Sequence, residues 1–154
     1  MKVLIVGGTG LTGATTARHL QQQGHEVTLM SRSRPSSPAL ADFPFIAGNY
    51  IEDDISEEQL AGFDWLVFAA GADIRMLPEG EDPEAFFTRA NSEGIPRFFA
   101  RARAAGIRRA AYLGTYYPQV VPDKVEASPY LKSRYLADRA IRAMSAEDFV
   151  VCSI

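Results

Sequence analysis

Residues 1–13 read MKVLIVGGTGLTG, an apolar run that ends in closely spaced glycines. Within this run, Lys2–Val6 is rich in β-branched residues, which predicts a fully buried strand. From Leu11 to Gln23 the composition changes to residues that favour helix, and a second apolar run follows at Glu26–Met30. The start of the chain is therefore predicted to form a strand, a helix and a second strand, which together make one βαβ unit.

The same alternation continues along the rest of the chain. The pattern predicts further strands at 45–47, 64–70, 109–113 and 148–153, helices at 57–61, 83–105 and 128–144, and proline-containing loops at 31–42 and 114–127. Gly94 and Pro96 are expected to kink or split the longest helix, because proline removes a helix hydrogen bond. Strands that alternate with helices predict an α/β fold, with a doubly wound, mostly parallel sheet and helices on both of its faces.

Length and composition limit the classes of protein. At 154 residues and 47% apolar content, the chain is expected to form one domain, residues 1–154. A net charge of -3 provides no basic field for nucleic acid or an anionic membrane. No stretch approaches the roughly 20 apolar residues that span a bilayer, and no signal peptide is recognisable. Cys152, the only cysteine, is expected to be buried on the last strand, and a soluble cytoplasmic protein is predicted.

Three glycines, Gly7, Gly10 and Gly13, lie between the first predicted strand and the first helix. One glycine permits a tight turn, another lets backbone N–H groups approach a pyrophosphate, and the third lets the helix pack closely on the strand. The phosphates then meet the positive end of the helix dipole. The motif predicts a nucleotide-binding turn, with a merely structural turn as the alternative. The residues expected to contact the nucleotide here are Gly7, Thr9, Gly10, Leu11 and Gly13.

The residues after the second strand bear on which dinucleotide is bound. Chains that bind NAD commonly place an Asp or Glu about 20 residues beyond the glycines. Here that place holds Ser31 and Arg32, with Arg34 close behind. A guanidinium pairs with a 2′-phosphate that a carboxylate would repel, so NADP(H) is favoured over NAD(H). The alternative is a solvated arginine on a loop.

Several segments together resemble the short-chain dehydrogenase/reductase superfamily, in particular its NAD-dependent epimerase/dehydratase family. They are MKVLIVGGTGLTG at 1–13, GHEVTLMSR at 24–32, FAAG at 68–71, TRANSEG at 88–94, AYLGTYY at 111–117 and YLKSRYLAD at 130–138. The resemblance covers nearly the whole chain and implies an NAD(P)-binding Rossmann fold. It also implies that Ala69, Ala70, Gly71 and Asn91 line the cofactor.

The resemblance further implies a catalytic tyrosine, a lysine four residues after it, and a hydroxyl on the fifth strand. Tyr130 fits the tyrosine, which acts as acid or base in that family, and packing on the core is its alternative role. Thr115 fits the hydroxyl, although another register places Tyr116 there. The lysine position holds Arg134, whose planar group is larger but keeps the positive charge on the same helix face. Thr115, Tyr130 and Arg134 are the predicted catalytic residues.

The resulting hypothesis is an NAD(P)-dependent oxidoreductase or epimerase/dehydratase domain. It would transfer hydride between a nicotinamide cofactor and a carbonyl or alcohol of a small-molecule substrate, with nucleotide sugars as one substrate class. The competing hypothesis is a non-catalytic NADP(H)-binding regulatory or redox-sensing module, motivated by Arg134. In the family, the substrate-binding part comes largely from sequence beyond the sixth strand, so this chain is expected to be part of a longer enzyme. A homodimer is one option for its assembly.

A metal site is not expected. The only histidines, His19 and His25, have no cysteine or carboxylate at ligand spacing. The acidic cluster at 52–58 is expected to lie at a solvated helix start rather than to hold a cation.

Overall fold

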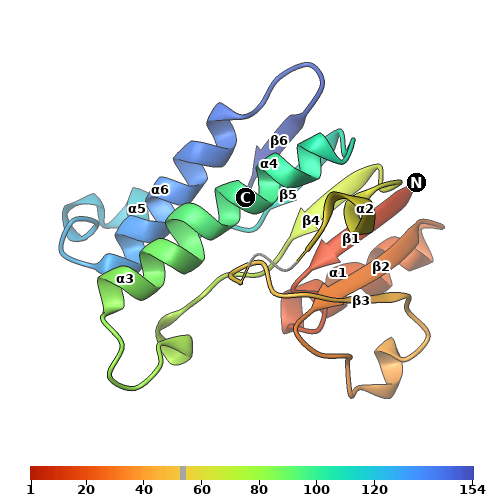
Figure 1. Cartoon of the computed structure of the whole chain (residues 1–154), viewed down its shortest axis with the longest axis horizontal. Coiled ribbons are helices and arrows are strands. Elements are labelled where there is room, and N and C mark those ends of the chain that lie inside the picture. The colour runs from red at the N-terminus through yellow and green to blue at the C-terminus, as the bar shows by residue number, and fades with distance from the viewer. Residues whose placement is uncertain (53–54) are drawn as a thin grey trace.

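One parallel sheet organises the protein, whose computed structural model describes residues 1–52 and 55–154. Six strands of the described residues lie in the order β3-β2-β1-β4-β5-β6, and each neighbouring pair is parallel (Figure 1). The strands are β1 (Lys2–Val6), β2 (Glu26–Ser31), β3 (Phe45–Ala47), β4 (Trp65–Phe68), β5 (Arg109–Tyr112) and β6 (Val150–Ser153). The strand order reverses direction at β1 and β4, which confirms the predicted doubly wound α/β fold.

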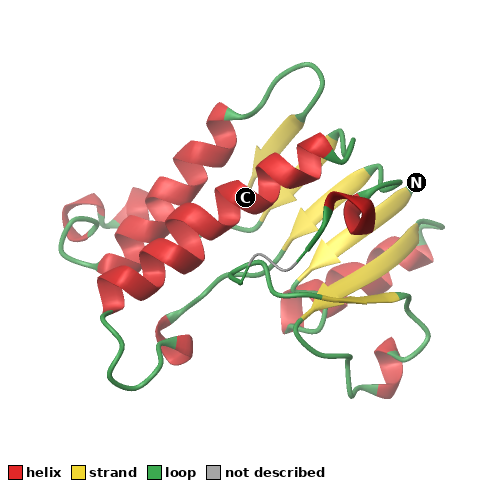
Figure 2. Ribbon diagram, viewed as in Figure 1, coloured by secondary structure: helices red, strands yellow, loops and turns green. Residues whose placement is uncertain are grey.

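Helices cover both faces of the sheet (Figure 2). They are α1 (Leu11–Gln22), α2 (Glu57–Leu60), α3 (Pro83–Phe87), a π-helix (Thr88–Glu93), α4 (Gly94–Ala104), α5 (Tyr117–Val120) and α6 (Pro129–Ala143), with 3-10 turns at Pro38–Leu40, Ile74–Met76 and Pro122–Lys124. In Figure 1, α1 lies behind β1 and β2, whereas α4 and α6 lie side by side on the opposite face. Both layers that the alternating sequence predicts are therefore present.

Two helix starts follow clear sequence signals. The Ser128 hydroxyl accepts a hydrogen bond from the Leu131 N–H at 3.3 Å at the start of α6. The Asp82 carboxylate accepts one from the Ala85 N–H at 2.8 Å at the start of α3, and a proline follows each of these caps. Such side chains satisfy N–H groups that have no partner in the first helical turn. Capping thereby fixes where α6 begins, and with it the position of Tyr130.

Two apolar cores pack on the two faces of the sheet. Leu66 and Phe68 belong to the larger core, beneath α3, α4 and α6, whereas Val67 belongs to the smaller core, beneath α1. Successive side chains of β4 therefore point to opposite faces, as strand geometry requires. The Phe68 ring lies 5.5 Å from the Phe99 ring and 6.2 Å from the Tyr112 ring, measured between centroids. This aromatic packing joins the carboxyl ends of β4 and β5 to α4.

The long helix predicted at 83–105 is continuous, and its irregularity lies before Gly94 rather than at Gly94 and Pro96 (Figure 1). Residues 88–93 form a π-helix, in which each N–H bonds five residues back. A Cβ at Gly94 would lie only 2.8 Å from the Arg89 carbonyl oxygen, so a glycine fits where the π-helix ends.

Two further expectations are wrong. The predicted loop at 114–127 contains α5 and a 3-10 turn. Cys152 is exposed rather than buried. Its neighbours Val151 and Ser153 face the larger core and α6, since Val151 packs on that core and the Ser153 hydroxyl hydrogen-bonds to the Asp138 carboxylate. Cys152 and Val150 therefore point to the other face, where Val150 is 46% exposed.

The acidic cluster at 52–58 lies only partly within the described residues, because Asp53 and Asp54 fall outside them. Glu57 and Glu58 occupy the first turn of α2, behind the capping box formed by Ser56. Within residues 1–52 and 55–154, no three His, Cys, Asp or Glu side chains gather closely enough to hold a metal ion. The same residues contain no helix that is long and apolar enough to span a membrane.

Candidate functional site

The glycine turn joins β1, β2 and the loop after β4. Gly7 has a φ of +79°, which glycine adopts without strain, and its N–H donates to the Met30 carbonyl oxygen at 2.8 Å. A Cβ at Gly7 would lie 2.8 Å from the Ala70 nitrogen, and a Cβ at Gly13 would overlap the Gly7 carbonyl oxygen. Glycine at these two positions therefore lets the turn, α1 and the loop after β4 meet closely.

α1 begins directly at this turn. Its N-cap, Gly10, offers no side-chain cap, and the first turn holds no acidic residue. The first N–H groups of a helix have no partner within it and carry the positive end of its dipole. The start of α1 is therefore suited to an anion such as a pyrophosphate.

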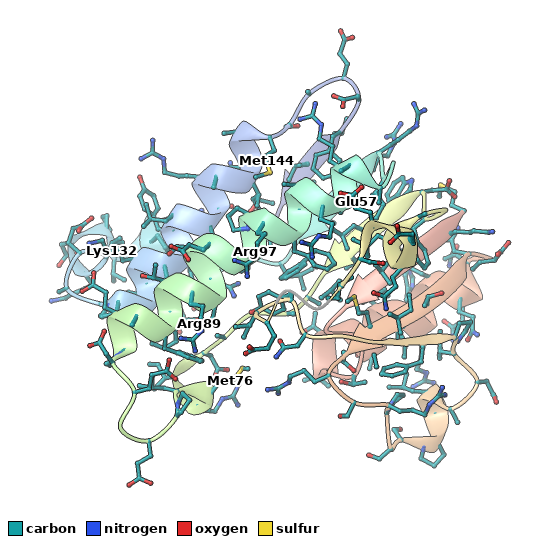
Figure 3. The ribbon with its side chains drawn as sticks, in the orientation of Figure 1. Glu57, Met76, Arg89, Arg97, Lys132 and Met144 are labelled. Carbon is teal, nitrogen blue, oxygen red and sulfur yellow. The ribbon has the colours of Figure 1, made fainter. Side chains whose placement is uncertain are left out.

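A first cleft of about 330 Å³ opens beside the turn. The predicted cofactor residues that line it are Gly7, Thr9, Gly10, Ser31, Arg32, Ala69, Ala70 and Gly71. Its remaining lining residues, which drew no prediction, are Gly48, Asn49, Tyr50, Ile51, Arg75 and Met76, of which Figure 3 labels Met76. Leu11 instead points to solvent, at 88% exposure, and Gly13 packs beneath the turn. The structure thus brings together most of the residues predicted for the cofactor.

The carboxyl end of β2 carries Ser31 and Arg32 to the rim of the first cleft. The Ser31 hydroxyl donates to the Ser33 carbonyl oxygen at 2.8 Å. The Arg34 guanidinium lies 5.2 Å from the centre of the Phe45 ring, a cation–π contact over β3. Of the two arginines, Arg32 is the one that lines the cleft.

Tyr50 lines the first cleft from the segment after β3. Its ring packs edge-on against Phe68, with centroids 5.1 Å apart, and burial raises the pKa of its hydroxyl to about 12 against the opposing charge of Arg134. The Arg97 guanidinium on α4 donates to the Ile51 carbonyl oxygen at 3.1 Å and holds this segment (Figure 3). The sequence signal that could have found Tyr50 is its place after the end of a strand, since parallel strands carry binding loops at their carboxyl ends.

A second cleft of about 250 Å³ lies on the other side of the loop after β4. It shares Ala69, Ala70 and Gly71 with the first cleft, and its other lining residues are Thr12, Ala72, Asp73, Leu113, Gly114, Tyr130 and Arg134. The Tyr130 ring packs against Phe87 at 5.5 Å, so Tyr130 combines a core contact with a place in the cleft. The predicted catalytic residues Tyr130 and Arg134 therefore meet at one cleft.

Thr115, the third predicted catalytic residue, follows the lining residue Gly114. Its hydroxyl oxygen accepts a hydrogen bond from the Tyr117 N–H at 3.5 Å. Tyr116 and Tyr117 are exposed and stack on each other, with ring centroids 4.6 Å apart. Thr115 thus lies at the edge of the second cleft, at the start of an exposed aromatic segment.

Arg134 reaches from α6 to the carboxyl ends of β4 and β5. It is only 6% exposed, and its Nη2 donates to the Leu113 carbonyl oxygen at 2.9 Å. The guanidinium lies 5.3 Å from the centre of the Tyr112 ring, and a Cβ at Gly71 would overlap its Nη1. Burial raises the pKa of Tyr112 to about 12, and the charge of Arg134 opposes that shift. The positive charge that sequence reasoning assigned to catalysis is therefore largely enclosed by protein.

Asn91, predicted to line the cofactor, lies in the π-helix and is fully buried. Its Nδ2 donates to the Ala72 carbonyl oxygen and to the Ser133 hydroxyl, each at 3.1 Å. Its Oδ1 accepts from the Ala72 N–H at 3.1 Å. These contacts use the donors and one acceptor of the amide within the protein. Asn91 therefore holds the loop after β4 to α6 from behind, instead of lining either cleft.

The chain belongs to the NAD dependent epimerase/dehydratase family, whose sequence model matches residues 3–154. It is 27% identical over 165 residues to the UDP-glucose 4-epimerase of Streptomyces lividans, covering 94% of this chain and 48% of that protein. It is 31% identical over 111 residues to a 3-diazoavenalumate denitrifying reductase of Streptomyces sp, covering 71% of this chain and 36% of that protein. The chain thus spans half or less of the length of these relatives.

A solved structure supports the same assignment. The Bordetella bronchiseptica enzyme WbmG, crystallised in complex with NAD and UDP, superimposes with a TM-score of 0.73 at 25% identity. The match covers 98% of this chain and 51% of WbmG. The sequence-based assignment to the NAD dependent epimerase/dehydratase family and the predicted Rossmann fold are confirmed.

Proposed function

We propose that this chain binds a nicotinamide dinucleotide across its two clefts and forms the cofactor half of an oxidoreductase or epimerase/dehydratase. The observation that carries the proposal is the wall Ala69–Gly71, which both clefts share where the strand order reverses. Ligands of doubly wound sheets bind at this switch point, and a dinucleotide has two halves to place on either side of it. The family of the chain favours this function over a non-catalytic binding module.

The residues present fit the adenosine half in the first cleft. The uncapped start of α1 meets the pyrophosphate, and the glycines of the turn let backbone N–H groups approach it. Tyr50 and Ile51 offer apolar contact to a flat base, and Arg32 faces the ribose end. The cofactor we propose is NADP(H) in preference to NAD(H), because Arg32 can pair with a 2′-phosphate.

The second cleft takes the reacting half in this proposal. When bound, the dinucleotide supplies the hydride chemistry. The chain's own part is to bind, orient and exchange a proton with the substrate oxygen: Tyr130 holds a proton at its phenolic oxygen, and Thr115 orients the substrate from the cleft edge. Arg134 supplies positive charge to this cleft. The proton leaves Tyr130 when a carbonyl is reduced and returns when an alcohol is oxidised.

The substrate we propose is a carbonyl or alcohol of a small molecule, with nucleotide sugars as the leading class. This follows the named activity of the Streptomyces lividans relative and the UDP bound to WbmG. A cytoplasmic location and a homodimer stay predictions of the sequence.

Parallel titrations with NADPH and NADH test the proposal, with nicotinamide fluorescence as the signal. We expect Arg32→Ala to weaken NADPH binding about tenfold or more and to leave NADH binding nearly unchanged, because a hydrogen bond to a charged group contributes about 1.5–3 kcal/mol. Arg34→Ala is the matched control, since Arg34 packs on Phe45. If the unaltered chain binds neither dinucleotide, the proposed function fails. Equal loss of both dinucleotides in Arg32→Ala would remove Arg32 as the reader of the 2′-phosphate.

A further inference from the structure

The Arg134 guanidinium lies between the segments that follow β4 and β5. On one side its Nη2 donates to the Leu113 carbonyl oxygen at 2.9 Å. On the other its Nη1 occupies the space that a Cβ of Gly71 would need. Beneath it lies the Tyr112 ring, 5.3 Å from ring centre to guanidinium carbon. One side chain from α6 thus contacts both strand ends at once.

Gly71 needs to be glycine because of this guanidinium. Gly71 does not have a positive φ. Among the described residues, the glycines with a positive φ are Gly7, Gly24, Gly62, Gly80 and Gly106. The φ of position 71 therefore does not by itself require glycine. The obstacle is the arginine side chain, which is buried and cannot swing into solvent without giving up its bond to Leu113.

Burial of the Arg134 charge costs free energy, so its contacts with the protein must offset that cost. Arg134 is 6% exposed, and its Nε has no hydrogen-bond partner among the described residues. Burying a guanidinium with an unmatched donor is unfavourable unless its other contacts offset the loss of water. The carbonyl of Leu113 and the face of Tyr112 are those contacts, and both belong to β5 and the residue after it.

We propose that Arg134 is a positioning residue that braces the loop after β4 against the end of β5 and so sets the width of the second cleft. The inference rests on the proposed function, because the two segments that it joins are the walls Ala69–Gly71 and Leu113–Gly114 of that cleft. Asn91 fixes the same loop one residue further along, through Ala72. Arg134 thereby acts on the cofactor through the walls, and Tyr130 is left as the acid–base group.

A double-mutant cycle with Gly71→Ala and Arg134→Met tests the brace. Each single variant is expected to weaken NADPH binding about tenfold, because each separates the guanidinium from one wall. The double variant is expected to bind no more weakly than either single variant, since the added methyl then enters space that the guanidinium has left. This non-additivity corresponds to a tenfold coupling, about 1.4 kcal/mol. Arg139→Met, an exposed arginine on the same helix, is the control.

Unfolding by urea is followed on the same proteins, so that fold and binding are separated. A role in stability alone would lower the unfolding midpoint and leave the NADPH dissociation constant unchanged in folded protein, which would overturn the proposal. Additive effects on binding would overturn it as well. If Arg134→Met does not fold, Arg134→Lys replaces it in the cycle, with the same coupling expected. If the unaltered chain binds no dinucleotide, the proposed function fails and the proposed effect of Arg134 on the cleft fails with it, whereas additive binding effects in chains that do bind NADPH overturn the brace alone.

Discussion

Replacement of Asn91 by leucine removes the amide that holds the loop after β4. Leucine has nearly the same size, so the change leaves little cavity, but the Ala72 N–H and carbonyl then lose their partner in a buried place. Each buried backbone group left without a hydrogen bond costs about 1–3 kcal/mol. Loss of partners for both Ala72 groups is expected to lower the free energy of unfolding by about 3 kcal/mol, once the gain from burying leucine is counted. For a domain of this size, that loss corresponds to a fall in Tm of about 6–12 °C.

The assay is thermal and urea unfolding of Asn91→Leu, together with NADPH titration of the folded variant. Ser133→Ala is the matched control, because it removes the hydrogen bonds of the Ser133 hydroxyl to the Asn91 amide and to the Tyr130 carbonyl oxygen but leaves both Ala72 groups paired. We expect this control to lose about 1–2 kcal/mol, the usual contribution of two hydrogen bonds. If the free energy of unfolding of Asn91→Leu is within about 1 kcal/mol of that of the unaltered chain, the Asn91 amide does not hold the loop after β4 and the reasoning is refuted.

The remaining predictions concern the glycine turn and the buried tyrosines. Gly13→Ala should destabilise the fold by about 1–2 kcal/mol, because overlap with the Gly7 carbonyl oxygen outweighs the gain in helix propensity. Gly10→Ala should be nearly neutral, because its Cβ would lie 3.3 Å from the same oxygen. Equal urea unfolding midpoints for the two variants would contradict this prediction. Tyr50 and Tyr112 have a pKa of about 12 in the folded state and near 10 when unfolded, so the unfolded chain loses these protons first and stability should fall as pH rises from 10 to 12. Tyr112→Phe should reduce this fall of the unfolding free energy with pH, as measured by urea unfolding. An unchanged dependence on pH would count against the burial of the Tyr112 hydroxyl.

The parts of the fold that could be predicted from sequence are those fixed by local chemistry. The apolar run of β1, the glycines of the turn and the caps Asp82 and Ser128 each act within a few residues, so their outcome is visible in the sequence. The alternation of strands and helices then indicates a parallel sheet with helices on both faces, because each crossover returns over the sheet. In the first cleft, the glycine motif and its spacing located Gly7, Thr9, Gly10, Ser31 and Arg32, whereas Ala69, Ala70 and Gly71 were expected from the family resemblance.

The misplaced residues depend on contacts between distant segments. Asn91 was expected at the cofactor, but the π-helix turns its amide toward Ala72, which lies far away in sequence. Cys152 looked like a core residue because its strand is apolar, yet its face of β6 is exposed. Tyr50 offers only one sequence signal, its place after a strand end, and its orientation in the cleft follows from packing on Phe68. No pattern in a single segment reports such contacts.

The π-helix at 88–93 makes chain length, as well as residue identity, a determinant of the site. Each N–H in this segment bonds five residues back instead of four, so the segment holds about one residue more than an α-helix of the same rotation. Loss of a single residue here would let the segment relax into an ordinary α-helix. The flanking helices α3 and α4 would then keep their faces, but the side chains within 88–93 would point in new directions, and Asn91 would lose its hold on the loop after β4. A one-codon deletion between α3 and α4 would therefore act on the clefts as strongly as a substitution within them, although it removes none of the residues that line them.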